Sequence, residues 1–379
     1  MNSLLKLIDY GQSYWLDNLS RKMILNGELK KRVTEQGLRG MTSNPSIFNN
    51  AISKSDDYDE QIIRLVKEGK STAEIYEALT VKDVQDACDI LRPVYDESQG
   101  VDGYVSLEVS PYLAQHAEAT MAEARHLFKT VNRPNLFIKI PGTKPCVPAI
   151  EQMLYEGINI NITLLFSIKS YEEVARAYIN ALDRRIKENK PIQNVASVAS
   201  FFLSRIDTLV DQLLNHRILP GEEENQSHLP QQLLGQTAVA SAILAYQSFK
   251  RIFSGKRWEA LAEKGARVQR PLWASTSTKN PEYSDVKYVE PLIGYNTVNT
   301  MPEETIAAFA DHGTAKENTI EDNLDEANQL LNDLERVGID IDRVTWQLVN
   351  DGIQKFIDPF AVLMKNISQK REQFIAEKV

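Results

Sequence analysis

The sequence is poor in the features that mark specialised classes of protein. It has two cysteines in 379 residues, Cys88 and Cys146, and their separation does not decide whether they form a disulfide. So few cysteines favour the reducing cytoplasm over a secreted disulfide framework. No stretch approaches 18 uncharged apolar residues, so no membrane-spanning helix is expected. Lys6 and Asp9 interrupt the first apolar residues, which argues against a signal peptide.

Sequence motifs for nucleotides and metals are also missing. Neither G-x-G-x-x-G nor G-x-x-x-x-G-K-[ST] occurs, and there is no H-E-x-x-H and no paired C-x-x-C. The histidines are scattered along the chain at His116, His126, His216, His228 and His312. A metal-dependent aldolase or hydrolase is therefore disfavoured, and neither a metal nor an organic cofactor is expected. Any chemistry must come from Lys, Asp, Glu, Ser and Thr side chains.

Positive charge is in deficit, with 43 Lys and Arg against 52 Asp and Glu and a net charge of −9. A chain this acidic is a poor general binder of nucleic acid or of anionic membranes, so neither is expected as a partner. If the protein handles an anionic substrate, its site must be locally basic against this background.

Short β-rich runs alternate with helical segments along most of the chain. The runs are 13–17, 40–42, 104–109, 136–140, 158–165, 195–200, 271–275 and 289–293. Strands that alternate with helices indicate a parallel sheet, and eight of them favour a closed barrel. We expect one α/β domain over 1–379, a (β/α)8 TIM-type barrel with helical additions. A polar run at 218–232 predicts a surface insertion within 211–235, and 340–379 is expected to be a C-terminal helical extension.

Capping patterns predict where some of the helices begin. Ser170 with Glu173 and Thr300 with Glu303 form two such patterns, and Thr80 is expected to open a third helix.

Lys139 lies inside the apolar run LFIKIP at 136–141. A buried ammonium is costly, so a lysine here is unusual. Alternation places Phe137 and Lys139 on one face and Ile138 and Ile140 on the other, and in a barrel the first face would point inward. The run alone fits an edge-strand lysine slightly better. The functional interpretation is a Schiff-base lysine, since desolvation favours the neutral, nucleophilic amine.

Two acids lie in or at the end of other strand-like runs. Asp17 ends one run, the position expected of a catalytic acid at the carboxyl end of a barrel strand, although a cap for the following helix fits that residue alone better. Glu108 lies inside a β-branched run, where a carboxylate needs a partner such as a lysine.

Several polar residues near strand ends suit a polyhydroxylated ligand. Asn44 follows a short strand, where a turn with a helix cap is the alternative. Asn161 and Thr163 share one face of their run, and Ser200 ends the next run with Arg205 five residues beyond it.

Together these segments resemble the transaldolase family. The stretches that carry the resemblance are GMTSNPSIF at 40–48, SLEVSP at 106–111, NLFIKIP at 135–141, GININITLLF at 157–166 and PLWAST at 271–276. The likeness runs from about Ile8 to about His312. The length of the chain and the run from NTVNTMP at 296–302 onward resemble the longer bacterial branch.

The resemblance implies a role for each matching position. Lys139 corresponds to the Schiff-base lysine, which the family carries on its fourth strand, and Asp17 to the acid/base at the C4 hydroxyl. Glu108 and Thr163 correspond to the pair that positions a water during imine formation. The expected ligands of the ketol hydroxyls and the phosphate are Asn44, Asn161, Ser200 and Arg205.

The chain departs from compact family members near the phosphate. Those members have Ser-Pro-Phe-Val-Gly-Arg where this chain has Ser200 to Arg205 with Phe202 between them, so Ser and Arg keep their places. Beyond the seventh strand, Ser275 is kept but the family arginine is not, and Lys279 is the candidate for the second phosphate-binding cation.

The implied activity is transfer of a dihydroxyacetone unit from sedoheptulose 7-phosphate or fructose 6-phosphate to an aldose phosphate in the pentose phosphate pathway. One alternative is a fructose-6-phosphate aldolase that releases free dihydroxyacetone, but those enzymes are shorter and have Tyr where this chain has Phe202. The other is a catalytically silent barrel that serves as a binding partner. The expected partners are small phosphorylated sugars, and the protein is expected to be a monomer or homodimer.

Overall fold

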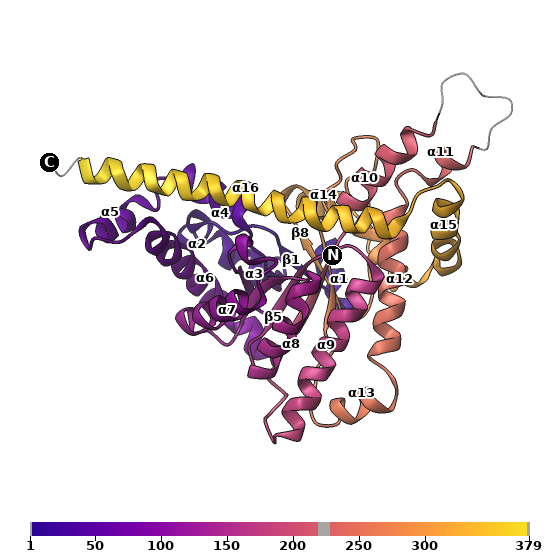
Figure 1. Cartoon of the computed structure of the whole chain (residues 1–379), viewed down its shortest axis with the longest axis horizontal. Helices are drawn as coiled ribbons and strands as arrows, with labels where there is room; N and C mark the ends of the chain where they lie inside the picture. Colours follow the sequence, from indigo (N-terminus) through magenta and orange to yellow (C-terminus); the bar gives the residue numbers. More distant parts are fainter. Residues whose placement is uncertain (1, 219–227, 377–379) are drawn as a thin grey trace.

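A computed structural model of the chain describes residues 2–218 and 228–376. In this part, eight parallel strands close into a barrel in the order of the sequence (Figure 1). The strands are β1 (Gln12–Leu16), β2 (Gly40–Met41), β3 (Tyr104–Glu108), β4 (Leu136–Pro141), β5 (Ile160–Leu165), β6 (Ser197–Phe202), β7 (Arg270–Ala274) and β8 (Thr297–Met301). The first and last strands close the ring through the register Gln12↔Thr297. The expected (β/α)8 fold with helical additions is confirmed.

Helices surround the barrel. They are α1 (Ser3–Asp9), α2 (Arg21–Leu25), α3 (Glu28–Glu35), α4 (Pro45–Ser53), α5 (Asp59–Lys67), α6 (Thr72–Glu97), α7 (Ala117–Val131), α8 (Val147–Glu156), α9 (Ile168–Lys187), α10 (Ser204–Asn215), α11 (Leu229–Leu233), α12 (Thr237–Ile252), α13 (Gly255–Ala262), α14 (Glu303–Asp311), α15 (Leu324–Arg336) and α16 (Ile341–Ala376). Short 3-10 turns are η1 (Pro111–Leu113), η2 (Lys144–Cys146), η3 (Glu290–Leu292) and η4 (Thr319–Glu321).

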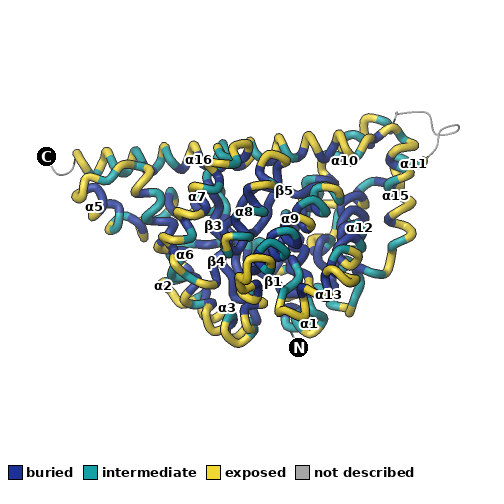
Figure 2. The backbone as a smooth tube through the Cα atoms, turned by 60° about the horizontal axis from the view of Figure 1, so that its bottom comes forward, coloured by how far each residue is buried: buried dark blue, intermediate teal, exposed yellow. Residues whose placement is uncertain are grey.

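The longest of these helices, α16, runs along one edge of the molecule (Figure 1). It packs against α4, α5, α6 and α10 and also contacts β5. Its outward side is exposed while the strands beneath are buried throughout (Figure 2). This helix therefore extends from the α4–α6 side of the barrel to α10.

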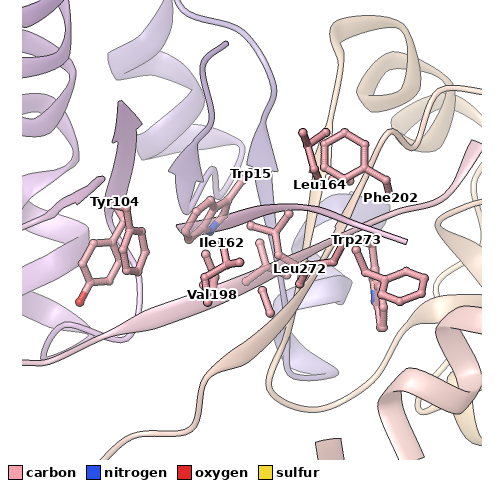
Figure 3. Close-up of a cluster of buried hydrophobic side chains, with 14 of the residues drawn as sticks. Trp15, Tyr104, Ile162, Leu164, Val198, Phe202, Leu272 and Trp273 are labelled. Atoms are coloured by element: carbon pink, nitrogen blue, oxygen red, sulfur yellow. The ribbon is translucent and has the colours of Figure 1, made fainter. Parts of the chain in front are cut away.

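Large side chains fill the barrel interior. The rings of Trp15 on β1 and Phe137 on β4 stack with centroids 6.1 Å apart, and Tyr104 on β3 stacks on Phe137 at 4.2 Å. Since β1 and β4 are not neighbours, this contact must cross the interior. Figure 3 shows Tyr104 at one end of the apolar cluster and Phe202 at the other. Lys139 follows Phe137 by two residues in a regular strand, so it also points inward.

A buried polar cluster closes the amino-terminal end of the barrel. Arg270, at the start of β7, pairs with Asp102 at 3.0 Å and donates to the Ser13 hydroxyl at 2.7 Å. Ser13 and the indole of Trp15 donate to the same aspartate. The opposite, carboxyl-terminal end is therefore the one that can open to a ligand.

The eighth strand predicted from the sequence is wrong. The run 289–293 contains η3, and the eighth strand is β8, later in the chain. Pro291 lies in the middle of the predicted run and cannot donate to a sheet ladder, whereas Thr297–Met301 is rich in β-branched residues. The other seven predicted runs each overlap a strand.

The three predicted helix starts are also wrong. Helix α9 is capped by Ser167, not Ser170. Helix α6 is capped by Ser71, which forms a complete capping box with Glu74, so Thr80 lies inside the helix. Thr300 lies inside β8, and α14 begins at Glu303 without a side-chain cap. A Ser or Thr followed by Glu three residues later also occurs inside helices and strands, so the pattern alone does not fix the boundary.

Both cysteines, Cys88 and Cys146, are free and buried. Residues 219–227 of the predicted insertion lie outside the described residues. In the described part of the chain, α10 precedes these residues and α11 follows them. No helix in the described ranges is long and apolar enough to cross a membrane.

Candidate active site at the carboxyl end of the barrel

A cavity of about 280 Å³ opens at the carboxyl-terminal end of the strands. Most of the site residues predicted from the sequence line it, and they come from six different strands and the loops beyond them. These residues are Asp17, Asn44, Lys139, Thr163, Ser200, Phe202, Arg205, Ser275 and Lys279. The two other predicted residues do not line the cavity but contact residues that do: Glu108 pairs with Lys139, and Asn161 accepts a hydrogen bond from Ser200.

Lys139 lies at the centre of this arrangement, with only 4% of its surface exposed. Its ammonium donates to the Ser43 carbonyl at 3.2 Å and lies 3.4 Å from Oε2 of Glu108. The strand β4 pairs with β3 and β5 within a closed ring, so it is not an edge strand. The alternative of a protective edge lysine is therefore wrong.

Glu108 is the closest acid to this amine. It lies on β3 directly opposite Lys139 in the strand register. Neither of its carboxylate oxygens has a hydrogen-bond partner within the described ranges. Burial raises the pKa of Glu108 to about 7, and the opposing charge of Lys139 limits that rise. This carboxyl group can therefore exchange a proton close to neutral pH.

Asp17 faces the same cavity from the end of β1. Burial raises its pKa, while the Lys139 charge and a hydrogen bond from Thr42 oppose the rise. Helix α2 is capped by Ser20, so Asp17 is not the helix cap that its local sequence favoured.

Two threonines hold the Asp17 carboxylate. Thr42 Oγ1 donates to Asp17 Oδ1 at 2.6 Å and lies 2.7 Å from Thr300 Oγ1. A hydroxyl has one hydrogen, so the Thr300 hydroxyl must be the donor to Thr42. Both threonines are buried. This chain of hydrogen bonds fixes one carboxylate oxygen of Asp17.

The polar residues of β5 and β6 form a connected set. Ser200 donates to Asn161 Oδ1 at 2.7 Å, and Asn161 Nδ2 donates to Ser106 at 3.0 Å. Thr163 differs, because its hydroxyl is buried and has no partner among the residues described. Asn44 lines the cavity and also caps α4 by accepting from Ile47 N, so the capping alternative is correct for its side-chain oxygen.

Arg205 lies in the first turn of α10 and brings a guanidinium group to the cavity. Its guanidinium carbon lies 5.2 Å from the Phe202 ring centroid and 5.9 Å from that of Phe356. Burial lowers the pKa of Arg205, and the charges of Asp17 and Glu108 oppose that change. Its buried Nη1 has no hydrogen-bond partner in the described part of the chain. A donor of this kind is ready for an anionic ligand.

The loop beyond β7 brings Ser275 and Lys279 to the same cavity. Ser275 has a positive φ of 56°, an uncommon conformation for a serine, and its hydroxyl lies 2.8 Å from that of Ser204. Lys279 is exposed, and its ammonium donates to Ser277 at 2.5 Å.

Sequence reasoning missed several lining residues. Thr42 belonged to a stretch that had been singled out, but Thr300 was interpreted as a helix cap. Lys355 and Phe356 come from α16, which had been expected only as an extension. Nothing in an amphipathic helix marks one lysine as different; the only signal was Gly352 inside it, which suggests close approach of another segment. Within the described residues, no three His, Cys, Asp or Glu side chains gather as a metal site would require.

The sequence of the chain matches one protein family and several known proteins over most of its length. The family described as transaldolase/fructose-6-phosphate aldolase matches residues 14–367. The transaldolase of Trichodesmium erythraeum (strain IMS101) is 47% identical over 371 residues, which cover 97% of each chain. Transaldolase 2 of Nostoc sp. (strain PCC 7120) is 48% identical over 373 residues, or 98% of each chain. The transaldolase of Frankia alni is 47% identical over 369 residues, or 97% of each.

Proposed function

Because the chain belongs to the transaldolase/fructose-6-phosphate aldolase family, we propose that the cavity at the barrel mouth is its active site and that Lys139 is the Schiff-base lysine. The activity is that of a transaldolase, a transferase that moves a dihydroxyacetone unit from a ketose phosphate to an aldose phosphate in the pentose phosphate pathway. The observation that carries the assignment is a buried lysine beside one acid, with a second acid in the same cavity.

The donor half of the reaction begins at the amine. Lys139 Nζ in its neutral form attacks the C2 carbonyl of the ketose phosphate, and the carbinolamine loses water to give an iminium ion. Asp17 takes the proton of the C4 hydroxyl, and the C3–C4 bond breaks. The bonding electrons move into the iminium to form an enamine, and the shortened aldose phosphate leaves. Addition of the enamine to an acceptor aldehyde reverses these steps.

Glu108 and Thr163 suit the proton transfers of imine formation. The carboxyl group of Glu108, with its pKa near 7, can both give and accept a proton at neutral pH. The unpartnered hydroxyl of Thr163 can hold a water that links this acid to the carbinolamine oxygen.

The remaining side chains suit substrate binding. Asn44, Asn161 and Ser200 can bond the ketol hydroxyls, and the apolar ring of Phe202 lies beside them. Arg205 would bind the phosphate, with Ser275 and Lys279 on the neighbouring loop. We place the protein in the cytoplasm, because both cysteines are free. We also propose that it acts on small phosphorylated sugars as a monomer or homodimer.

Neither alternative has support. Phe202 brings no phenol that could activate a water for release of free dihydroxyacetone. A silent barrel would have no need of Lys139 and Asp17 in one cavity with Glu108 paired to the lysine.

Borohydride trapping tests the assignment. Reduction in the presence of fructose 6-phosphate should add one reduced three-carbon unit, located by peptide mass at Lys139, and Lys139→Ala should abolish it. Lys144→Ala, which changes an exposed lysine just beyond the same strand, is the matched control and should label normally. Labelling that persists in Lys139→Ala, or that maps to another lysine, rules the mechanism out.

A further inference from the structure

The middle of α16 lies directly against the phosphate side of the cavity. Gly352 is so close to the barrel that a Cβ there would meet Leu164 Cδ2 at 3.0 Å and Arg205 Nη1 at 3.6 Å. One turn later, the Phe356 ring lies 5.4 Å from Lys139 Nζ and 5.9 Å from the Arg205 guanidinium carbon. This part of the helix is therefore within reach of both the reacting amine and the main phosphate cation.

Lys355 shares this face of the helix. Residues three and four positions apart lie side by side on a helix, so Lys355 and Phe356 flank the position above Gly352. Both line the cavity. Lys355 is exposed and makes no hydrogen bond or ion pair with any residue in the described ranges. Its ammonium is thus available to a ligand.

The charges around the cavity call for a second cation. A sugar phosphate is close to a dianion at neutral pH, and the cavity also contains the acids Asp17 and Glu304. Lys139 is needed for the chemistry, which leaves Arg205 as the one partly buried cation among the described lining residues. Without another positive group, the acids would offset much of the attraction that Arg205 provides.

The sequence-derived candidate, Lys279, is less suited to this role. Its ammonium already donates to Ser277, and it also lines a separate hollow whose other members include Asp207 and Asp211.

We propose that Lys355 is the second phosphate-binding cation and that α16 thereby helps to select phosphorylated donors. The proposal rests on the proposed function, because it assumes a sugar phosphate in this cavity. Arg205 supplies the buried, directional contact, and Lys355 supplies charge from the solvent side. The role of Lys355 is in binding and specificity, and the bond-breaking steps do not pass through it.

The donor half-reaction provides the test, since it needs no acceptor. Borohydride trapping is measured against the concentration of fructose 6-phosphate and, separately, of fructose. Lys355→Gln should raise the half-saturating concentration of fructose 6-phosphate by roughly 5- to 20-fold, between the contribution of an exposed ion pair and that of a charge-assisted hydrogen bond. The value for fructose should not change. Lys355→Arg should restore most of the loss.

Two further variants and one competitor make the test specific. Lys365→Gln removes an exposed lysine from the same helix away from the cavity and should match the wild type. Lys279→Gln should have a smaller effect than Lys355→Gln. Inorganic phosphate should compete with fructose 6-phosphate less well in Lys355→Gln than in the wild type.

The outcomes separate the two proposals. If the wild type is trapped but Lys355→Gln binds fructose 6-phosphate normally, or is equally impaired with fructose, the role of Lys355 is overturned and the proposed function stands. If Lys279→Gln alone raises the requirement for fructose 6-phosphate, the second cation is Lys279. If neither sugar labels the wild type, the proposed function fails and the role of Lys355 fails with it.

Discussion

At the scale of single residues, the site depends on acids that are buried with few donors. The Asp17 carboxylate is held at Oδ1 by Thr42, and Glu108 has only the ion pair with Lys139. Both carboxyl groups have a raised pKa, primarily because burial disfavours the ionised form. A carboxylate kept from water in this way is a stronger base than an exposed one, which suits the abstraction of a hydroxyl proton.

Asp17→Asn should separate imine formation from bond cleavage. The amide keeps the size of the side chain but cannot accept the C4 hydroxyl proton. Loss of a general base typically costs about 10²- to 10⁴-fold in rate, and we expect kcat to fall within that range. Borohydride should still trap the intact donor on Lys139, so the adduct mass should change from three carbons to six with fructose 6-phosphate. Near-normal turnover would show that Asp17 is not the base.

Thr300→Val tests the hydrogen-bond chain behind Asp17. The variant keeps the shape of the side chain but removes the donor to Thr42, which can then turn away from the carboxylate. Loss of a neutral hydrogen bond of about 1 kcal/mol would lower kcat by about fivefold.

The same variant should leave the KM for fructose 6-phosphate unchanged, because Thr300 acts through Thr42 and not on the phosphate. Thr300→Ser should recover the rate, since it restores the hydroxyl. An increase in KM with constant kcat would instead indicate a direct contact with substrate.

At the scale of secondary-structure elements, most of the barrel could be predicted from the sequence. Strands such as β4 and β5 are marked by apolar alternation around one or two polar residues, and this pattern also identified which side chains point inward. The eighth strand was not found in this way, because polar residues outnumber apolar ones in Thr297–Met301 and the segment ends beside a helix start. Its Asn299 is buried, with its amide donating to the Tyr288 carbonyl, a long-range contact without a local signal.

The contribution of α16 to the cavity could not be predicted from the sequence either, because it also depends on a tertiary contact without a local signal. Its apolar residues follow a helical period, but periodicity does not say which surface they cover. Lys355 and Phe356 reach the site only because the helix crosses the barrel mouth, where Phe356 approaches Lys139 and Arg205. The proposed catalytic residues at strand ends were predictable because the barrel brings those ends together in any sequence with this fold.

Gly352→Leu tests whether the close packing of α16 on the barrel at Gly352 is needed for activity. A leucine side chain cannot fit between the helix and Leu164, so the helix must move outward near Lys355 and Phe356. We expect kcat/KM with fructose 6-phosphate to fall by more than about tenfold, equivalent to roughly 1.4 kcal/mol. The melting temperature should change less, because α16 also packs on α4, α5 and α6.

Gln354→Leu is the control for this substitution. It places the same side chain on an exposed position of the helix and should keep full activity. A Gly352→Leu enzyme with wild-type kcat/KM would show that the close approach of α16 is not required.

At the scale of the whole molecule, the two ends of the barrel differ in what their polar groups do. The cluster of Arg270, Asp102 and Ser13 at the amino-terminal end is joined by an ion pair and hydrogen bonds, and in it only Arg270 Nε lacks a partner among the described residues. At the carboxyl-terminal end, Glu108, Thr163 and Arg205 have buried polar atoms without partners in the described part. Unpaired buried polar groups lower the free energy of unfolding, so we expect these groups at the carboxyl-terminal end to make the protein less stable.

The pH dependence of folding should reveal that cost at Glu108. Its pKa is raised from 4.5 to about 7 in the folded protein, so the folded state binds the proton more tightly than the unfolded state. The associated stability is complete below about pH 4.5 and is lost as the pH rises towards 7. A shift of this size corresponds to about 3 kcal/mol of unfolding free energy.

Glu108→Gln removes this dependence, because glutamine remains neutral at every pH. The free energies of unfolding of wild type and variant should be similar at pH 4, since a protonated glutamate resembles glutamine. At pH 8 the variant should be the more stable by about 1–3 kcal/mol, even though it loses activity. Urea unfolding at the two pH values measures the difference, in which the titration of groups that do not interact with Glu108 cancels. In a Lys139→Met background the gap at pH 8 should widen, because the ammonium that favours the ionised glutamate is gone. A gap that is equal at pH 4 and pH 8 would mean that Glu108 titrates normally and that its burial has no energetic consequence.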